Sequence, residues 1–240
     1  MIWLRGLGYY LMQRLTLLIV NKWANVVYVT SIPEVKYFPK KRVIVVKGGV
    51  NIPHKQGYRW EAWHSAIFIG RFHYQKGVLK LIDIWSKVNK VLPSATLKMV
   101  GEGVLLKKCI KKRNSLGANI TFLPFTDGIG KEKYIRESKI ILHPATYDSG
   151  GMACAEGMAY GLPAVGFDLE AHKTYYAKGM IKVNTIQQFA DEIVKLLTDR
   201  EYYNYWSKEA RDYTVKEWDW DKRAEEIYVE SDCFPKERNG

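Results

Sequence analysis

The sequence has few cysteines, no long apolar run and fewer acidic than basic residues. Its three cysteines, Cys109, Cys154 and Cys233, are widely spaced and form no CxxC pair. They predict neither a disulfide framework nor a zinc cluster, and they favour a reducing, cytoplasmic setting. The five histidines show no metal-ligand spacing either, so no metal site is expected.

The amino-terminal segment 1–23 is apolar, but Arg5, Gln13 and Arg14 interrupt it, and its longest clean run, LTLLIV, has six residues. A membrane-spanning helix needs about 20 apolar residues, and a secretory signal needs a small-residue cleavage site that is not evident here. Two readings stay open. A helix packed on the protein's own sheet is favoured over an amphipathic helix that lies peripherally on a membrane.

The 37 Lys and Arg residues against 25 Asp and Glu give a net charge of +12. This excess favours anionic partners, such as phosphorylated small molecules, phospholipid headgroups or nucleic acid. A lysine-rich solvated surface explains the same charge equally well. Nucleic acid is supported only by this charge and by the aromatic content of 13%, so it ranks last and no nucleic-acid partner is expected.

Apolar runs of strand length alternate with helical patterns along most of the chain. SAIFIG, ATLKMV, ANITFL, KIILHP and LPAVGF have strand length, and segments such as KGVLKLIDIWSKVNKVL and IQQFADEIVKLLTD carry apolar residues at helical spacing. Two shorter strand patterns, NVVYVTS and RVIVVKGGVN, precede them, and two aromatic-rich helices follow to about residue 230. The alternation predicts βαβ units and a doubly wound, Rossmann-like parallel sheet of the α/β class.

Four loops that follow predicted strands carry unusual residues: RFHYQKG, GEG, PFTDG and the segment YDSGG. Ligands bind open parallel sheets at the carboxyl ends of the strands, so these loops are expected to meet at one rim. Arg71 and Lys76 flank the start of a helix, whose free N–H groups already favour anions. A guanidinium and an ammonium there predict a diphosphate site, although ordinary surface charges are the simpler alternative.

The segment DSGGMACAEGMAYGLPAV predicts a helix that starts near Gly151 and Met152. Glycines permit close approach of the backbone, and free N–H groups there could hold phosphate or sugar oxygens. Glu156, one turn into the helix, could accept hydrogen bonds from the two vicinal hydroxyls of a ribose. Its neighbours read as buried, and an unpaired buried glutamate is costly, so Glu156 is expected to have a role. Asp148 could accept hydrogen bonds from a second sugar.

GRFHYQKG, MVGEG, FLPF and DSGGMACAEGMAYGLPAV together resemble the donor-binding, carboxyl-terminal domain of retaining GT-B glycosyltransferases of the family 4, or group 1, type. The hallmark of that family is two acidic residues separated by seven, after which comes a stretch like AMAxGxPVV. Asp148 and Glu156 match the spacing of the acidic pair, and GMAYGLPAV matches the stretch after it. The resemblance covers nearly the whole chain but only about half of the family's two-domain architecture.

The resemblance implies a role for each candidate residue. Arg71 and Lys76 would bind the diphosphate of a UDP-, GDP- or ADP-sugar, and Asp148 would face the transferred sugar. Glu156 would hold the ribose, and the loop from Leu123 to Phe125 would read the base. Backbone N–H groups of Gly151 and Met152 would also contact the donor. The reaction would need no metal or other cofactor and would retain the anomeric configuration, on a hydroxyl of a glycan, lipid-linked or protein acceptor.

Three departures from the family pattern are visible. Asp148 replaces the more usual glutamate, Pro124 stands where glycine is common, and KGGVN replaces a hinge sequence like PNGVD. Residues 1–50 are expected to be a remnant of the acceptor domain and hinge, residues 51–230 the nucleotide-sugar-binding domain, and residues 231–240 a tail. A partner chain could supply the acceptor domain. The alternative function is a non-catalytic nucleotide-sugar-binding module or the partner subunit of a two-chain glycosyltransferase.

Overall fold

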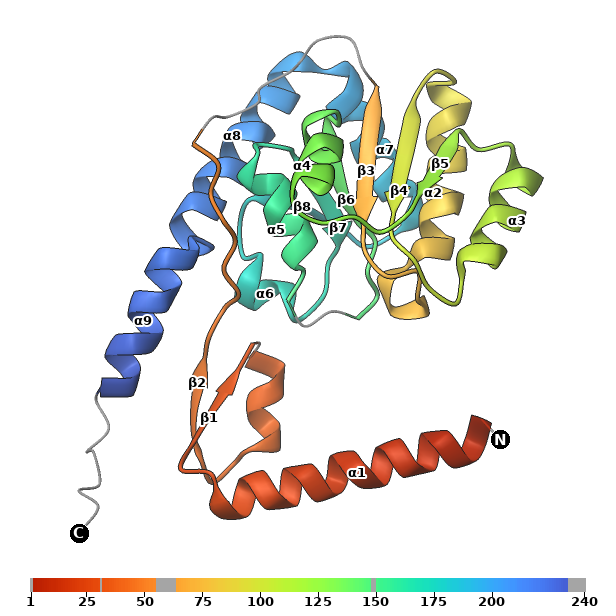
Figure 1. Ribbon diagram of the computed structural model, residues 1–240. Coiled ribbons are helices and arrows are strands. Elements are labelled where there is room, and N and C mark those ends of the chain that lie inside the picture. Colours follow the sequence, from red (N-terminus) through yellow and green to blue (C-terminus); the bar gives the residue numbers. More distant parts are fainter. Residues whose placement is uncertain (1, 31, 55–63, 148–149, 233–240) are drawn as a thin grey trace. The chain divides into compact units, whose positions relative to one another are not determined.

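The structure is a computed structural model that describes residues 2–30, 32–54, 64–147 and 150–232 (Figure 1). The chain divides into two compact units, Met1–Lys47 and Gly48–Gly240. The second unit contains the large sheet that the sequence predicts.

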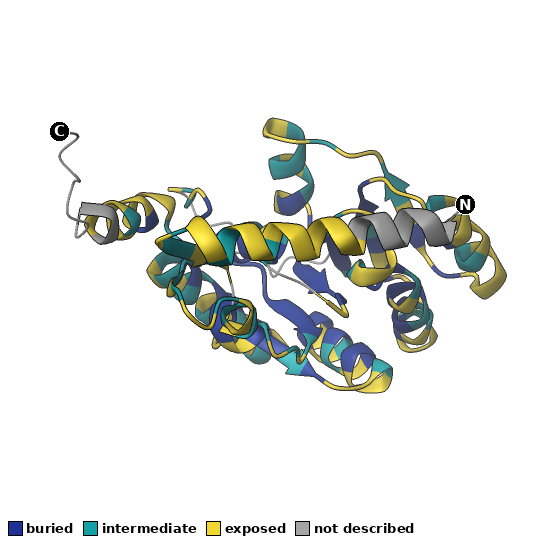
Figure 2. Cartoon of the chain, turned by 90° about the horizontal axis from the view of Figure 1, so that it is seen from below, coloured by how far each residue is buried: buried dark blue, intermediate teal, exposed yellow. Residues whose placement is uncertain are grey.

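The first unit is a helix followed by a small parallel strand pair. Its elements are α1 (Ile2–Trp23), β1 (Val26–Val29), the 3-10 helix η1 (Ile32–Tyr37) and β2 (Arg42–Val45). The side chains of Leu15 and Leu18 on α1 are 58% and 68% exposed, and most of the described part of the helix is exposed in Figure 2. Among the described helices, none is both long and apolar enough to span a membrane. Whether this helix packs on the protein's own sheet or lies on a membrane therefore stays a prediction.

The second unit is built on a six-stranded, fully parallel sheet with the strand order β5-β4-β3-β6-β7-β8. Its strands are β3 (Ser65–Ile69), β4 (Thr96–Val100), β5 (Ile120–Leu123), β6 (Ile140–His143), β7 (Ala164–Phe167) and β8 (Met180–Val183). Its helices are the 3-10 helix η2 (Tyr74–Lys76), α2 (Val78–Val91), α3 (Leu106–Leu116), α4 (Ile129–Arg136), α5 (Met152–Ala159), α6 (His172–Tyr175), α7 (Ile186–Thr198), α8 (Arg200–Glu217) and α9 (Trp220–Asp232). The predicted doubly wound α/β fold is confirmed.

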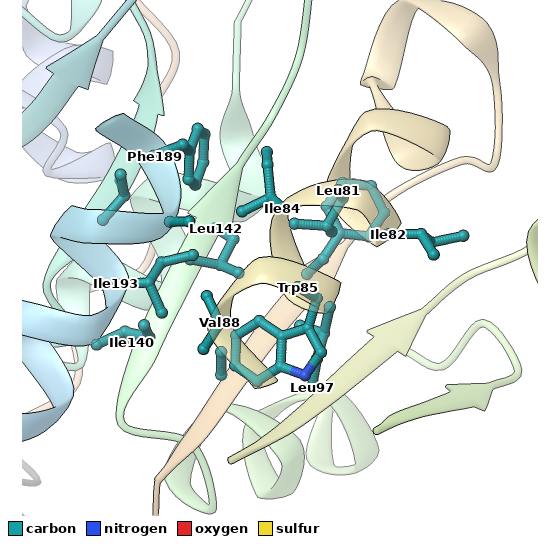
Figure 3. Close-up of a cluster of buried hydrophobic side chains, with 14 of the residues drawn as sticks. Leu81, Ile82, Ile84, Trp85, Val88, Leu97, Ile140, Leu142, Phe189 and Ile193 are labelled. Atoms are coloured by element: carbon teal, nitrogen blue, oxygen red, sulfur yellow. The ribbon is translucent and has the colours of Figure 1, made fainter. Parts of the chain in front are cut away.

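Side chains alternate between the two faces of the sheet, and each face has its own core. Ala66 and Phe68 of β3 belong to one buried cluster, with side chains of α2, α3 and α7, whereas Ile67 belongs to the other, with side chains of α4, α5 and α8. Figure 3 shows the first cluster, in which Trp85 of α2 lies among aliphatic side chains of helices and strands. Burial on both faces explains why the strands read as continuous apolar runs.

The carboxyl-terminal helices are anchored by a buried tryptophan. Trp218, between α8 and α9, is fully buried, and its indole Nε1 donates to the carbonyl of Tyr175 at 3.0 Å. The backbone N–H of Val50 donates to the carbonyl of Trp218 at 2.7 Å. Asp219 Oδ1 accepts from the backbone N–H of Asp221 at 3.0 Å, so this aspartate begins α9.

Candidate functional site

The strand order creates a switch point between β3 and β6. From β3 the chain continues outward through β4 and β5 on one side, and from β6 through β7 and β8 on the other. In doubly wound sheets a crevice opens at such a point, outside the carboxyl ends of the two strands. The four loops singled out in the sequence come after β5, β4, β3 and β6, which are neighbours in the sheet.

The loop after β3 is anchored by one buried aromatic side chain, and its charged residues lie next to that anchor. Phe72 is fully buried, and its ring lies 6.0 Å from that of Phe122. Arg71, next to it, is exposed, and Lys76 is half-buried at the end of η2. His73 Nδ1 accepts a hydrogen bond from the backbone N–H of residue 75 at 3.5 Å, so His73 caps the amino-terminal end of η2. Two of the predicted anion ligands thus lie on one short loop at the start of α2.

The loop after β3 is fastened to the loop after β6. Gly77 has a φ of 65°, and a Cβ added to it would lie 1.8 Å from the carbonyl oxygen of Pro144. The backbone N–H of Thr146 donates to the carbonyl of Gln75 at 2.8 Å. Only a glycine at position 77 permits this approach. The contact brings the segment with Arg71 and Lys76 against the segment that leads into α5.

The loops after β4 and β5 continue the same edge. A Cβ on Gly101, which has a φ of 144°, would lie 2.1 Å from the carbonyl oxygen of Gly70, and the backbone N–H of Phe72 donates to the carbonyl of Glu102 at 2.7 Å. The backbone N–H of Gly101 donates to the carbonyl of Leu123 at 3.0 Å. Main-chain contacts therefore hold the four loops in register from β5 to β6.

Two further predicted residues lie at the end of β5 and in the loop after it. Leu123 is half-buried at the end of the strand, and Phe125 is 64% exposed. An exposed aromatic ring at a sheet edge is available for stacking.

The segment before α5 approaches other parts of the unit closely. Gly151 has a φ of 57° and is buried, and its carbonyl accepts from the hydroxyl of Tyr176 at 2.6 Å. Met152, the first residue of α5, is 41% exposed. The first amides of a helix have no intrahelical acceptor, so they can receive an anion here. Asp148 lies outside the described residues.

Glu156 lies one turn into α5, as predicted, and forms an ion pair that the sequence did not indicate. Lys131 Nζ of α4 lies 2.7 Å from Glu156 Oε1 and 3.0 Å from Asp127 Oδ1. The Glu156 and Lys131 side chains are 27% and 22% exposed. Burial alone would lower the pKa of Lys131, but the hydrogen bonds and charges of the two carboxylates outweigh it and raise that pKa. The pKa of Asp127 is lowered, first by the hydrogen bond that the backbone N–H of Gly128 donates to it and then by the hydrogen bond and the charge of Lys131.

A buried cluster of aromatic rings lies at the carboxyl end of β6. His143, at the end of β6, is 7% exposed, and its ring centroid lies 5.2 Å from that of His172 and 6.0 Å from that of Tyr176. The His172 Nδ1 atom lies 2.9 Å from the carbonyl oxygen of Phe167. Within the described ranges, no group of three or more His, Cys, Asp or Glu side chains is placed to hold a metal ion.

Solved structures of other proteins have the same fold as this chain. The structure resembles HepE of Anabaena, solved in complex with UDP-glucose, with a TM-score of 0.81 and 17% identity over 92% of this chain and 67% of that one. It resembles TarM of S. aureus, solved as a mutant with UDP, with a TM-score of 0.78 and 18% identity over 88% of this chain and 44% of that one. The second unit therefore has the fold found in GT-B glycosyltransferases.

The sequence assigns the family. The model of one family, glycosyl transferases group 1, matches residues 64–213, and the chain belongs to that family. A phosphatidyl-myo-inositol mannosyltransferase of Mycobacterium leprae is 27% identical over 199 residues, which are 77% of this chain and 52% of the relative. An amylovoran biosynthesis glycosyltransferase of Erwinia amylovora is 33% identical over 109 residues, or 44% of this chain and 29% of the relative. The chain spans about half the length of the curated relatives it matches, or less.

Proposed function

We propose that this chain is the donor-binding part of a retaining glycosyltransferase, which transfers a hexose from a nucleoside-diphosphate sugar to a hydroxyl acceptor. One observation carries the proposal. The cationic loop with Arg71 and Lys76 and the glycine-started helix α5 flank the switch point of the sheet, and the loop is fastened to the segment that leads into α5. The names of a mannosyltransferase relative and of a neighbour solved with UDP-glucose support it.

Each candidate residue has a proposed role in holding the donor. Arg71 and Lys76 bind the diphosphate, since a cationic fork and an ammonium beside a helix start suit two phosphoryl groups. Glu156 accepts hydrogen bonds from the ribose hydroxyls. Asp148 faces the transferred sugar. The backbone N–H groups of residues 151 and 152 contact the donor.

The base is proposed to lie at the loop after β5. Leu123 ends β5 and Phe125 lies in the loop after it. In the proposal the backbone of this segment contacts the base, and the exposed ring of Phe125 offers a stacking surface. Titration with the three nucleotides decides whether uracil, guanine or adenine fits this loop.

The proposed chemistry rests on position and charge rather than on a metal ion. The bond between the anomeric carbon and the diphosphate oxygen breaks, and a bond from that carbon to the acceptor oxygen forms on the same face of the sugar. The acceptor proton passes to the leaving diphosphate. Arg71 and Lys76 stabilise the negative charge that develops there, and preorganised charges of this kind usually supply the largest part of catalysis.

The acceptor side is also a proposal. Residues 1–50, which include all of the first unit, are taken as the last part of an acceptor domain and its hinge, and a partner chain is one source of the remainder. The acceptor is a hydroxyl on a glycan, a lipid-linked sugar or a protein. The proposed location is cytoplasmic, with the amino-terminal helix as the candidate for peripheral membrane contact.

Calorimetric titration with UDP, GDP and ADP tests the proposal. We expect one nucleotide to bind the full chain, and Glu156→Ala to weaken that binding at least tenfold, because a hydrogen bond to a charged group contributes about 1.5–3 kcal/mol. Glu225→Ala, an exposed change on α9, is the matched control. Unchanged binding by Glu156→Ala would contradict the placement of the ribose, and no binding of any nucleotide would contradict the proposed donor site.

A transfer assay separates the enzyme from the non-catalytic alternative. The full chain is incubated with the sugar conjugate of the nucleotide that binds and with simple hydroxyl acceptors. Transfer that is lost in Lys76→Ala, with the fold retained, supports the catalytic proposal. Binding without transfer favours a module that works with a partner subunit.

A further inference from the structure

Lys131 joins two parts of the rim that are far apart in the sheet. It lies on α4, which comes after β5, whereas its partner Glu156 lies on α5, which comes after β6. Strands β4 and β3 separate β5 from β6. Buried side chains of α4 and α5 share one hydrophobic cluster, so the two helices cover the same face of the sheet. The 2.7 Å ion pair therefore spans the region where the donor nucleotide is proposed to bind.

The ion pair is the end of a short polar chain that starts at a backbone amide. The N–H of Gly128 donates to Asp127 Oδ1 at 2.8 Å, and Lys131 Nζ lies 3.0 Å from the same oxygen. Lys131 then donates to Glu156 Oε1 at 2.7 Å. The Lys131 side chain is only 22% exposed, so its ammonium is held between two carboxylates rather than extended into solvent.

This arrangement occupies one oxygen of Glu156 and leaves the other available. Among the described residues, Oε2 of Glu156 has no hydrogen-bond partner, whereas Oε1 accepts from Lys131. A glutamate side chain has several rotamers, and ordering it costs conformational entropy. A partner that fixes Oε1 before the nucleotide arrives removes part of that cost from binding. The oxygens of a glutamate carboxylate accept hydrogen bonds from hydroxyl groups.

We propose that Lys131 is a positioning residue for the donor, which orients Glu156 so that its second oxygen meets a ribose hydroxyl. The inference rests on the proposed function, because it assigns Glu156 to the ribose. It makes a specific claim: Lys131 contributes to recognition of the ribose hydroxyls and contributes little to binding of the diphosphate. A lysine that only fastened α4 to α5 would affect both parts of the nucleotide alike.

Discrimination between UDP and 2′-deoxy-UDP tests this claim, because a structural role does not change the ratio of the two affinities. We expect the full wild-type chain to bind UDP about tenfold more tightly than 2′-deoxy-UDP, the ratio that one hydrogen bond to a charged group produces. In Lys131→Met the ratio should fall to about threefold or less, mainly through weaker UDP binding. Lys131→Arg, which keeps the charge, should restore most of it. If GDP or ADP is the nucleotide that binds, its 2′-deoxy form replaces 2′-deoxy-UDP.

Lys133→Met is the matched control, because Lys133 lies on the same helix with a side chain that is 70% exposed. It should keep the wild-type ratio. The inference is overturned if Lys131→Met keeps that ratio, whether both affinities are unchanged or both fall by the same factor. If Lys131→Met does not fold, Lys131→Ala carries the same test, since it also removes both the charge and the donor. Failure of the wild-type chain to bind any nucleotide overturns the proposed function itself, and with it this inference.

Discussion

Replacing Gly77 by alanine tests whether the cationic loop is held against the end of β6. An added Cβ would lie 1.8 Å from the carbonyl oxygen of Pro144. The φ of 65° alone costs an alanine about 1–2 kcal/mol. The obstacle is a main-chain oxygen, so relief requires the backbone to move, and overpacking of this kind costs about 1–3 kcal/mol. The shift also strains the hydrogen bond from Thr146 N–H to the carbonyl of Gln75, which contributes about 1 kcal/mol.

We therefore expect Gly77→Ala to lower the free energy of unfolding by about 3–6 kcal/mol. Gly117→Ala is the matched control, because Gly117 has nearly the same backbone, with a φ of 61°, and no atom within 4 Å of an added Cβ. It should lose only about 1–2 kcal/mol. The difference between the two variants measures the contact with Pro144 and isolates it from the backbone term.

Urea unfolding followed by tryptophan fluorescence gives both values. Titration with the nucleotide that binds gives a second readout: Gly77→Ala should weaken binding, since the loop with Arg71 and Lys76 moves, and Gly117→Ala should not. Equal losses of stability in the two variants would refute the close approach of this loop to β6. Unchanged nucleotide affinity in a folded Gly77→Ala would refute its link to the donor site.

Three further predictions concern stability in the second unit. Burial lowers the pKa of Lys139 from 10.5 to about 8, so its charge opposes folding fully below pH 8 and this opposition disappears as the pH rises through 10.5. Lys139→Met should thus stabilise the protein by about 1–3 kcal/mol at pH 7 and much less at pH 10; an equal gain in urea unfolding at both pH values would contradict this. Thr185→Ala removes the capping box that Thr185 forms with Gln188 at the start of α7, and should cost about 1 kcal/mol in the same assay, with an unchanged midpoint as the contrary result. Tyr176→Phe removes the 2.6 Å hydrogen bond to the carbonyl of Gly151 and should lower the free energy of unfolding by about 0.5–1.5 kcal/mol. Thermal unfolding measures this loss, and an unchanged melting temperature would contradict it.

The sequence predicted the fold because the local and global patterns agree. SAIFIG and KIILHP read as buried strands since both of their faces are covered, and they are β3 and β6 at the centre of the sheet. Gly117 ends α3 with the left-handed backbone that such an end requires, and glycine is the usual residue there. The strand β8 was not predicted, because Met180–Val183 is short and carries a lysine in its middle. The four-residue helix α6 was missed for a similar reason.

The candidate site was predicted in part. Loops that come after consecutive strands can be located from the sequence, and Glu156 was expected one turn into a helix that does begin at Met152. Its ion pair with Lys131 was not expected, because the two residues are 25 positions apart and lie on different helices. The only local signal was the spacing of Asp127 and Lys131, four apart at a helix start, which is common on solvated helices.

The sequence by itself determined which segments become strands and helices, which loops lie at the carboxyl ends of strands, and which family the motifs resemble. These properties depend on periodicity, glycine placement and short motifs, all of which are local along the chain. The tertiary structure alone decided that β3 and β6 are neighbours, that Gly77 meets Pro144, and that Lys131 reaches Glu156. These contacts depend on strand order and helix packing, and the positions that they join carry no shared pattern in the sequence.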